Sequence, residues 1–445
     1  MKFNSEHELL KYTSKIIGKT FKEIDSEGLL QKTSLKQQKG VLGHIVETGF
    51  YKYPRNSNNK PDFEELGIEL KVTGYKKNKN GSKSAKERLV LSKIDFNKII
   101  NETFESSHVL SKCNKMLIIW YEYNKNKDPK DFLITDFQLY DMTKDKKIFE
   151  NDFKIIKNKV LAGKAHELRE GDTSYLGACT KARTASDRTS QPFSDILAKP
   201  RAYSLKNAYM TGILRQSEEM PLIEFSSNYK TVEDYIVDKL KPYFGKTQIE
   251  IFEEITGESI GENVPKNINK MISNILIGKD EELPLKDELF TKTSFVIKNI
   301  PIQENGKSRE RMSFRTLKLS EFDEEWEDSF WKNYFEETTI ITISYVEVNK
   351  SRNGHRVLKN VKKISFNDED FDAFEKTYNQ IKIAIKEQNI DLLPTSANGF
   401  KNLELQIAPK GIKGDDAYNN FLKKEKTKVC FMISKDVINK KLELQ

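Results

Sequence analysis

The sequence predicts an α/β protein with two tandem domains, each built on a mixed central sheet with helices on its faces. The chain has 445 residues, which is too many for one ordinary core. Hydrophobic residues make up 37% of it, and 26 phenylalanines are available to fill real cores. A series of landmarks also recurs along the chain at a nearly constant spacing. Together these observations predict two domains of related fold.

The repeat begins with an amphipathic helix in each half of the chain. The segment "SEHELLKYTSKIIGKTFKEI" opens with Ser5 and Glu8, a capping-box pattern, and continues as an amphipathic run. The segment "TVEDYIVDKLKPYFGKTQIEI" opens with Thr231 and has the same layout. Both contain a Gly-Lys-Thr triplet, at 18–20 and 245–247, an offset of 245 − 18 = 227 residues. A helix is therefore expected at the start of each domain.

Lysines mark the later landmarks of the repeat. One pair ends short apolar runs in "LGIELKV" and "TKTSFVIKNI", and a basic turn follows each run. The other pairs lie in "LGACTKAR" and "LQIAPKGI", and in "RAYSLKNAY" and "CFMISKDVI". The matched lysines are Lys71 with Lys298, Lys181 with Lys410, and Lys206 with Lys435, at offsets of 227, 229 and 229 residues. Chance matches would not keep this order and spacing, so we infer a duplication, with domains at 1–220 and 221–445.

Composition excludes several classes of protein. No apolar run approaches the ~18 residues of a membrane span, and the N-terminal segment has no secretory apolar region. The three cysteines, Cys113, Cys179 and Cys430, are far apart and have no zinc-site or disulfide spacing. A reduced, cytoplasmic protein without a membrane partner is expected. The net charge of +8 is a weak indication of an acidic partner.

The segment "KPDFEELGIELKV" (60–72) concentrates chemically useful groups. A strand is expected over "LGIELKV", so Glu69 and Lys71 should point to the same face, and Asp62 should approach Glu69 across the preceding turn. Two carboxylates and the backbone carbonyl of Leu70 would offer oxygen ligands to Mg²⁺. Glu47 lies in "KGVLGHIVETGF", a helix-like segment whose positions 41, 42, 45 and 46 should face inward, and it would add a further charge. Such spacing alone is more often a structural ion pair.

Two neighbouring features favour a functional interpretation. The run "GYKKNKNGSKSAKER" (74–88) is strongly basic and has Asn80-Gly81 at its centre, which predicts a hairpin able to contact phosphates. The second copy keeps its lysine but lacks the carboxylates. The replacements are Val296 for Glu69, Leu289 at or near the position of Asp62, and Asn274 for Glu47. Loss of three charges at once is the pattern of a metal site that has been disabled.

At these residues the sequence resembles the MutH-like PD-(D/E)xK endonucleases that act at GATC, and its two-copy layout is similar to the Sau-three-A-I type of restriction enzyme. The resemblance covers "KGVLGHIVE", "KPDFEELGIELKV", "GKAHELREGDTSYLGACTKARTAS" and "AKPRAYSLKNAYMTGILR". It implies two MutH-like domains, a catalytic one with a cleft for the duplex and a second one that binds DNA without cutting. The catalytic set it implies is Glu47, Asp62, Glu69 and Lys71, with Asp62, Glu69 and Leu70 at the metal.

The resemblance also implies a DNA-contacting set. The expected contacts are Lys181, Arg183, Arg201, Tyr203, Ser204, Lys206, Lys410 and Lys435. The aromatic position of the second segment is Tyr203, with Ser204 as an equally plausible register. One departure is Cys179, which stands where the family has a base-reading arginine.

The expected function is that of a type II restriction endonuclease that hydrolyses double-stranded DNA at 5′-GATC-3′ with Mg²⁺. A MutH-like mismatch-repair nickase and a non-catalytic GATC-binding protein are the alternatives. A palindromic site has two equivalent halves and needs two DNA-recognising elements. The second domain would therefore either recognise the other half of the same GATC site or bind a second GATC site. A dimer on DNA and a cognate methyltransferase in the same system are the further expected partners.

Overall fold

The structure is a computed structural model that divides the chain into two compact units. The first comprises Met1–Glu224 with Thr291–Thr293, and the second comprises Phe225–Phe290 with Ser294–Gln445. It describes residues 2–32, 40–53, 60–78, 81–181, 186–216, 228–261, 263–278, 288–350, 353–410, 414–424 and 426–443. The boundary expected at 220 and 221 lies outside the described residues. Within those residues, no helix combines the length and apolar character needed to cross a membrane.

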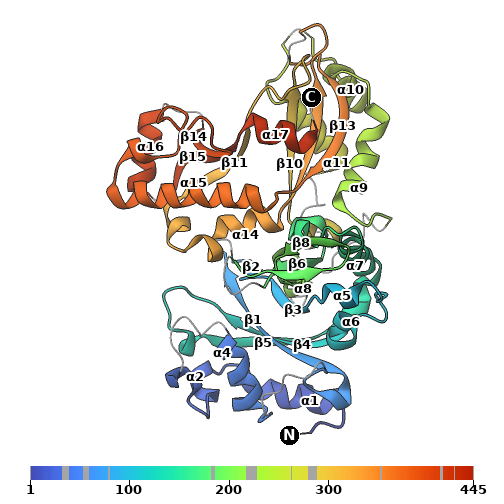
Figure 1. Cartoon of the computed structure of the whole chain (residues 1–445), viewed down its shortest axis with the longest axis vertical. Helices are drawn as coiled ribbons and strands as arrows, with labels where there is room; N and C mark the ends of the chain where they lie inside the picture. Colours follow the sequence, from blue (N-terminus) through green and yellow to red (C-terminus); the bar gives the residue numbers. More distant parts are fainter. Residues whose placement is uncertain are drawn as a thin grey trace. The chain divides into compact units, whose positions relative to one another are not determined.

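The first unit begins with a mixed sheet of four strands. In sheet order these are β2 (Lys83–Ala85), β1 (Ile68–Lys77), β4 (Lys115–Glu122) and β5 (Leu133–Asp141). Strands β1 and β4 run parallel, whereas β1 with β2 and β4 with β5 run antiparallel. The N-terminal helices cover one face of this sheet (Figure 1). They are α1 (Glu6–Thr13), α2 (Phe21–Ile24), α3 (Leu29–Lys32) and α4 (Val41–His44).

Side chains of β4 alternate between two buried faces. Leu117 and Ile119 belong to the core under the N-terminal helices, while Ile118 and Trp120 are also fully buried. A central parallel pair with both faces covered explains why "KMLIIWYE" is a nearly continuous apolar run.

A second sheet in this unit has three antiparallel strands. In sheet order they are β3 (Leu89–Lys93), β9 (Arg201–Leu205) and β6 (Leu176–Thr180). A short hairpin of β7 (Thr189–Gln191) and β8 (Ser194–Ala198) follows β6 in the chain. The helices of this part are α5 (Phe96–Ile99), α6 (His108–Cys113), α7 (Lys146–Leu161) and α8 (Asn207–Gln216). The connection 86–88 joins β2 of the first sheet to β3 of the second.

The second unit repeats this plan. One sheet has the order β10 (Phe295–Ile302), β12 (Thr339–Val346) and β13 (Val357–Ile364), with the first pair parallel and the second antiparallel. The other is antiparallel, with the order β11 (Met312–Lys318), β15 (Lys426–Ile433) and β14 (Leu405–Pro409). These orders and directions match β1-β4-β5 and β3-β9-β6.

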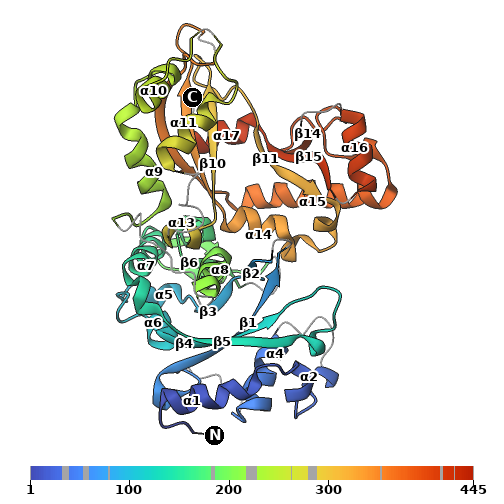
Figure 2. The same cartoon turned by 180° about the vertical axis from the view of Figure 1, so that it is seen from behind.

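The helices of the second unit lie beside these sheets (Figure 2). They are α9 (Val232–Leu240), α10 (Gln248–Thr256), α11 (Ile268–Ile277), α14 (Phe330–Glu337), α15 (Asp368–Glu387), α16 (Gly414–Lys423) and α17 (Lys435–Leu442). Helix α13 (Glu288–Lys292) begins in the second unit, and its last two residues belong to the first. Helices α9, α10 and α11 lie along one side of the β10-β12-β13 sheet in both views (Figures 1 and 2). Helices α15 and α16 pack against β14.

The predicted landmarks recur at the level of single hydrogen bonds. Ser5 caps α1 by accepting from the Glu8 amide, and Thr231 caps α9 in the same way. Gly18 and Gly245 both have positive φ, at +81° and +89°, and each donates its amide to a strand carbonyl, in β5 and in β13 respectively. Glycine suits both positions because the left-handed region strains other residues. The predicted α/β fold with two tandem domains is confirmed.

Candidate active site

Strand β1 carries the central pair of the candidate site. Glu69 and Lys71 are two residues apart and point to one face, with 2.7 Å between Lys71 Nζ and Glu69 Oε1. The strand extends beyond the expected segment "LGIELKV", because its outer half pairs with β2 to form the basic hairpin. Gly81 in the hairpin turn has a φ of +83°, while residues 79 and 80 lie outside the described residues.

A tight reversal of the chain brings Asp62 to the same strand. The Phe63 amide donates to the Ile68 carbonyl at 2.9 Å, and Gly67 makes the turn with a φ of +64°. Asp62 then lies beside β1, where its Oδ2 accepts from the Leu70 amide at 2.9 Å. Asp62 and Glu69 are thereby held at one place, as the sequence predicted.

Electrostatics show that the carboxylates form one cluster. Burial raises the pKa of Asp62 to about 6, and the charge of Glu69 adds to this rise. The Leu70 amide and Lys71 lower the same pKa, and Glu47 contributes a smaller increase. An acidic cluster whose members repel one another is suited to bind a cation.

Glu47 reaches the cluster from a helix. Residues Ile45–Phe50 form a π-helical turn that continues α4, a feature that often occurs at functional sites. The four positions predicted to face inward are all buried, at 41, 42, 45 and 46. The Glu47 side chain is 17% exposed, and its Oε2 lies 3.5 Å from His44 Nδ1.

The sequence did not indicate that Lys112 and Cys113, at the end of α6, lie near the cluster. The Nζ of Lys112 is 3.6 Å from Glu69 Oε1. Burial raises the pKa of the Cys113 thiol to about 12. The parallel register pairs Ile68 with Lys115, so residues just before β4 lie beside the start of β1. In the sequence, Lys112 is only a lysine three residues before the apolar strand β4. Its closeness to Glu69 can be predicted only if β1 and β4 are known to be parallel neighbours.

The donor set fits a magnesium ion. Glu69 Oε2 is buried and has no hydrogen-bond partner among the described residues, which is costly unless something occupies that position. Among the described residues, no three or more His, Cys, Asp and Glu side chains converge to hold a metal by themselves. An ion here would rely on Asp62, Glu69 and the Leu70 carbonyl, and on waters and substrate oxygens. Mg²⁺ characteristically binds in this way.

The matching place in the second unit is occupied differently. Lys298 of β10 donates its ammonium to the Ser313 carbonyl and lies 4.6 Å from the centre of the Phe314 ring. Val296, which replaces Glu69, packs against the hydrophobic core, and Leu289 is buried in α13. The lysine is therefore stabilised by a backbone carbonyl and an aromatic ring in place of carboxylates.

Three of the predicted DNA-contacting lysines lie on the surface. Lys181 follows β6 and Lys410 follows β14, and both side chains are exposed. Their amides donate to equivalent neighbours, the carbonyls of Pro200 at 2.8 Å and Lys428 at 2.6 Å. Lys435 is exposed at the first position of α17. Arg183 lies outside the described residues.

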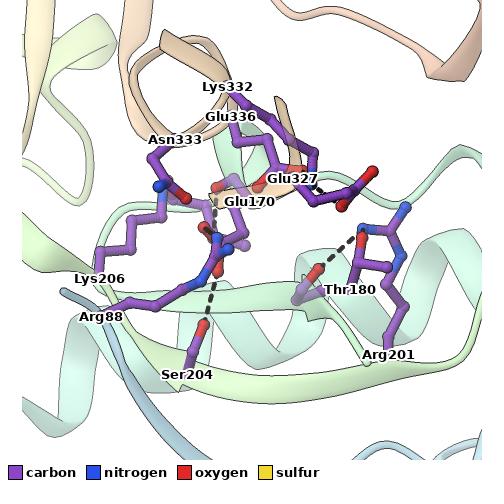
Figure 3. A network of polar contacts seen from close by, with 12 residues as sticks. Arg88, Glu170, Thr180, Arg201, Ser204, Lys206, Glu327, Lys332, Asn333 and Glu336 are labelled. Atoms are coloured by element: carbon purple, nitrogen blue, oxygen red, sulfur yellow. Dashed lines mark hydrogen bonds and ion pairs between the residues drawn. The ribbon is translucent and has the colours of Figure 1, made fainter. Parts of the chain in front are cut away.

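The remaining predicted contacts are buried along and just after β9. They are Arg201, Tyr203, Ser204 and Lys206. Arg201 Nη1 donates to Thr180 Oγ1 at 2.9 Å, and Ser204 Oγ donates to Glu170 Oε1 at 2.7 Å (Figure 3). The physical reason is that both faces of β9 are covered, since all five of its residues are buried and successive side chains point to opposite faces. In this structure these polar groups are engaged internally, which differs from the expected DNA-facing surface.

Lys206 and Tyr203 have separate internal surroundings. The Lys206 ammonium donates to the Thr173 carbonyl. The Tyr203 ring stacks near Phe153, and its hydroxyl has no hydrogen-bond partner among the described residues. Tyr203 also lines a surface pocket of about 250 Å³. The other residues around this pocket are Lys93, Asp95, Lys98, Ile99, Glu102 and His108.

Comparisons with known proteins agree with this geometry. The family of the DNA mismatch repair enzyme MutH matches residues 51–152, a range that contains Asp62, Glu69, Lys71 and Lys112. The sheet with its acidic cluster is therefore a MutH-like nuclease domain. The type II restriction enzyme Sau3AI of Staphylococcus aureus is 37% identical over 358 residues, covering 76% of this chain and 72% of that enzyme. The chain belongs to the Sau3AI-like family of MutH-related endonucleases.

Proposed function

We propose that the chain is a type II restriction endonuclease that recognises 5′-GATC-3′ in double-stranded DNA and hydrolyses it with Mg²⁺. The observation that supports this best is the unpartnered Glu69 oxygen in an acidic cluster flanked by two lysines. The family relationship supports the same class of activity.

The catalytic groups are proposed to act as follows. Asp62, Glu69 and the Leu70 carbonyl would hold Mg²⁺, which when bound acidifies a water and neutralises charge on the phosphate. Lys71 would orient the attacking water or stabilise the negative charge that develops at phosphorus. Lys112 contacts the Glu69 carboxylate as well and would supply a second positive charge. Glu47 would add negative charge around the ion from the helix side.

Recognition is proposed to rest on the paired surface lysines. Lys181 and Lys410 follow equivalent strands in the two units, and lysine to guanine O6 and N7 is a common major-groove contact. The second unit is proposed as a MutH-like DNA-binding or effector domain that completes one palindrome or binds a second site. Arg183 and Lys435 are proposed as further DNA contacts, and a dimer on DNA would bring a second catalytic site. A methyltransferase that protects GATC sites in the host is the partner this activity requires.

Plasmid digestion tests the proposal directly. The purified chain is incubated with a GATC-containing plasmid and Mg²⁺, and the product ends are sequenced. Discrete fragments bounded by GATC support a restriction enzyme. Nicked circles would instead support a MutH-like nickase, and intact plasmid with specific binding would support a non-catalytic binder.

A matched variant ties the activity to the cluster. Glu69→Gln should abolish cleavage but keep DNA binding, because it removes a metal-binding charge and preserves the side-chain shape. Cleavage at the wild-type rate by this variant would rule out the metal assignment.

A further inference from the structure

A buried carboxylate outside the acidic cluster joins two parts of the first unit. Glu170 Oε2 lies 2.5 Å from Arg88 Nη1, and Glu170 Oε1 accepts from Ser204 Oγ at 2.7 Å (Figure 3). Both oxygens of this one side chain are therefore engaged, one by a cation and one by a hydroxyl. Charge-assisted bonds of this kind are stronger and more directional than neutral ones.

The two donors come from different segments of the first unit. Arg88 lies in the connection 86–88, directly after β2, which pairs with the catalytic strand β1, and directly before β3. Ser204 lies in β9, the middle strand of the second sheet. Glu170 thus fixes the point at which the chain passes from the catalytic sheet to the sheet that leads to Lys181.

Glu170 also lies directly against β6. A Cβ atom added at Gly177 would be 3.1 Å from Glu170 Oε1 and 3.0 Å from Ser204 Oγ, so glycine leaves the space that the carboxylate occupies. Gly177 and Ser204 are paired across the sheet. Strand β6 ends at Thr180, and Lys181 follows at once. The carboxylate is therefore packed on the strand that carries the proposed base-reading lysine.

The segment that carries Glu170 is itself held in place. Asp152 of α7 accepts backbone hydrogen bonds from Ser174, Tyr175 and Leu176 at 2.8, 2.7 and 2.9 Å. The Lys206 ammonium holds the Thr173 carbonyl of the same segment. Because these bonds fix the backbone that follows it, Glu170 is hindered from moving with Arg88 if the connection moves. The ion pair resists such a movement.

We propose that Glu170 is a positioning residue that fixes the β3-β9-β6 sheet, which leads to Lys181, relative to the β2-β1-β4-β5 sheet, which carries Glu69 and Lys71. Binding of Lys181 to its DNA bases would thereby be coupled to cleavage. This inference rests on the proposed function. Removing the Glu170 charge deletes the ion pair that ties Arg88 to this carboxylate, so the junction would relax and the two sheets would lose their fixed relation. We therefore expect the preference for GATC over altered sites to fall more than the cleavage rate on GATC itself.

The experiment compares cleavage of GATC sites with cleavage of sites that differ by one base. Glu170→Gln keeps the shape and the bond to Ser204 but removes the charge opposite Arg88. The kcat/KM ratio of cognate to altered sites should fall roughly tenfold, the range expected for a coupling residue. Arg88→Met, which removes the opposite charge, should produce a similar fall, and the double variant should be no worse than either single one.

A matched control is available on the same unit. Glu150 pairs with Lys154 on the exposed face of α7, so Glu150→Gln should leave the ratio unchanged. An unchanged ratio in Glu170→Gln would overturn the inference. An equal loss on both kinds of site, together with a lowered melting temperature, would show a merely structural role and would also overturn it. Wild-type protein that fails to cut GATC would overturn the proposed function, which the first digestion reveals separately.

Discussion

Replacing Asp62 with asparagine should stabilise the metal-free protein while abolishing cleavage. The Asp62 carboxylate is held beside Glu69, and burial raises its pKa from 3.8 to about 6, with the charges of Glu69 and Glu47 adding to the effect. Asparagine retains a carbonyl oxygen that can accept the Leu70 amide, which now donates to Asp62 at 2.9 Å. The substitution therefore removes the repelling charge and keeps the local geometry.

The size of the effect follows from the pKa rise. A rise of roughly two units corresponds to about 3 kcal/mol at about 1.4 kcal/mol per unit, and residual hydration reduces it, so a gain of about 1–3 kcal/mol is expected. Because the folded-state pKa is raised, the ionised carboxylate destabilises the fold above the unfolded pKa. The cost is absent below pH 3.8, grows between 3.8 and about 6, and is complete above that. The advantage of the variant should therefore disappear as the solution is acidified.

Urea unfolding in the presence of EDTA measures this difference at neutral and acidic pH. Added Mg²⁺ should then stabilise the wild type by mass action but leave the variant almost unaffected. Glu64→Gln is the control, because Glu64 forms an exposed ion pair with Lys60 in the same segment and should change stability by less than ~1 kcal/mol. A variant less stable than the wild type in EDTA at neutral pH would refute the reasoning, as would a difference independent of pH.

Three further substitutions have distinct expected outcomes. Lys112→Met should lower the cleavage rate by about 10²-fold while gel-shift binding persists, because it removes a charge beside Glu69; an unaltered rate would exclude a catalytic role. Lys181→Ala should weaken GATC binding by ~1–3 kcal/mol and leave random-sequence binding intact in a competition titration, whereas equal losses on both would point to a phosphate contact. Gly67→Ala should destabilise the protein by about 1 kcal/mol, because of its positive φ, and should slow cleavage by displacing Asp62; normal kinetics would contradict that link.

The features that could be predicted from sequence are those set by local periodicity or by repetition. The shared face of Glu69 and Lys71 follows from the two-residue period of a strand, and the caps at Ser5 and Thr231 follow from short-range patterns. The offset between copies predicted related folds, and the strand orders β10-β12-β13 and β11-β15-β14 match β1-β4-β5 and β3-β9-β6. The equivalent places of Lys181 and Lys410 after β6 and β14 come from the same repeat.

The features that could not be predicted depend on which strands become neighbours. Lys112 reaches Glu69 only because β4 lies parallel to β1 and begins beside it. The burial of Arg201 and Ser204 depends on what covers the two faces of β9, including partners more than 20 residues away along the chain, such as Thr180 and Glu170. The sequence motif marks this strand as important. It does not distinguish a strand that contacts DNA from one that supports the contact.

In the second unit, apolar residues stand at the places expected to correspond to Glu69 and Asp62. Lys298 keeps its place on the strand, but its ammonium now binds the Ser313 carbonyl and lies on the Phe314 ring. Val296 is half-buried and packs against the hydrophobic core, so a carboxylate introduced there would lose part of its hydration. Leu289, near the place of Asp62, is buried as well. Because the lysine and its surroundings have been repacked together, single reversions in the second unit should destabilise it before they could restore a metal site.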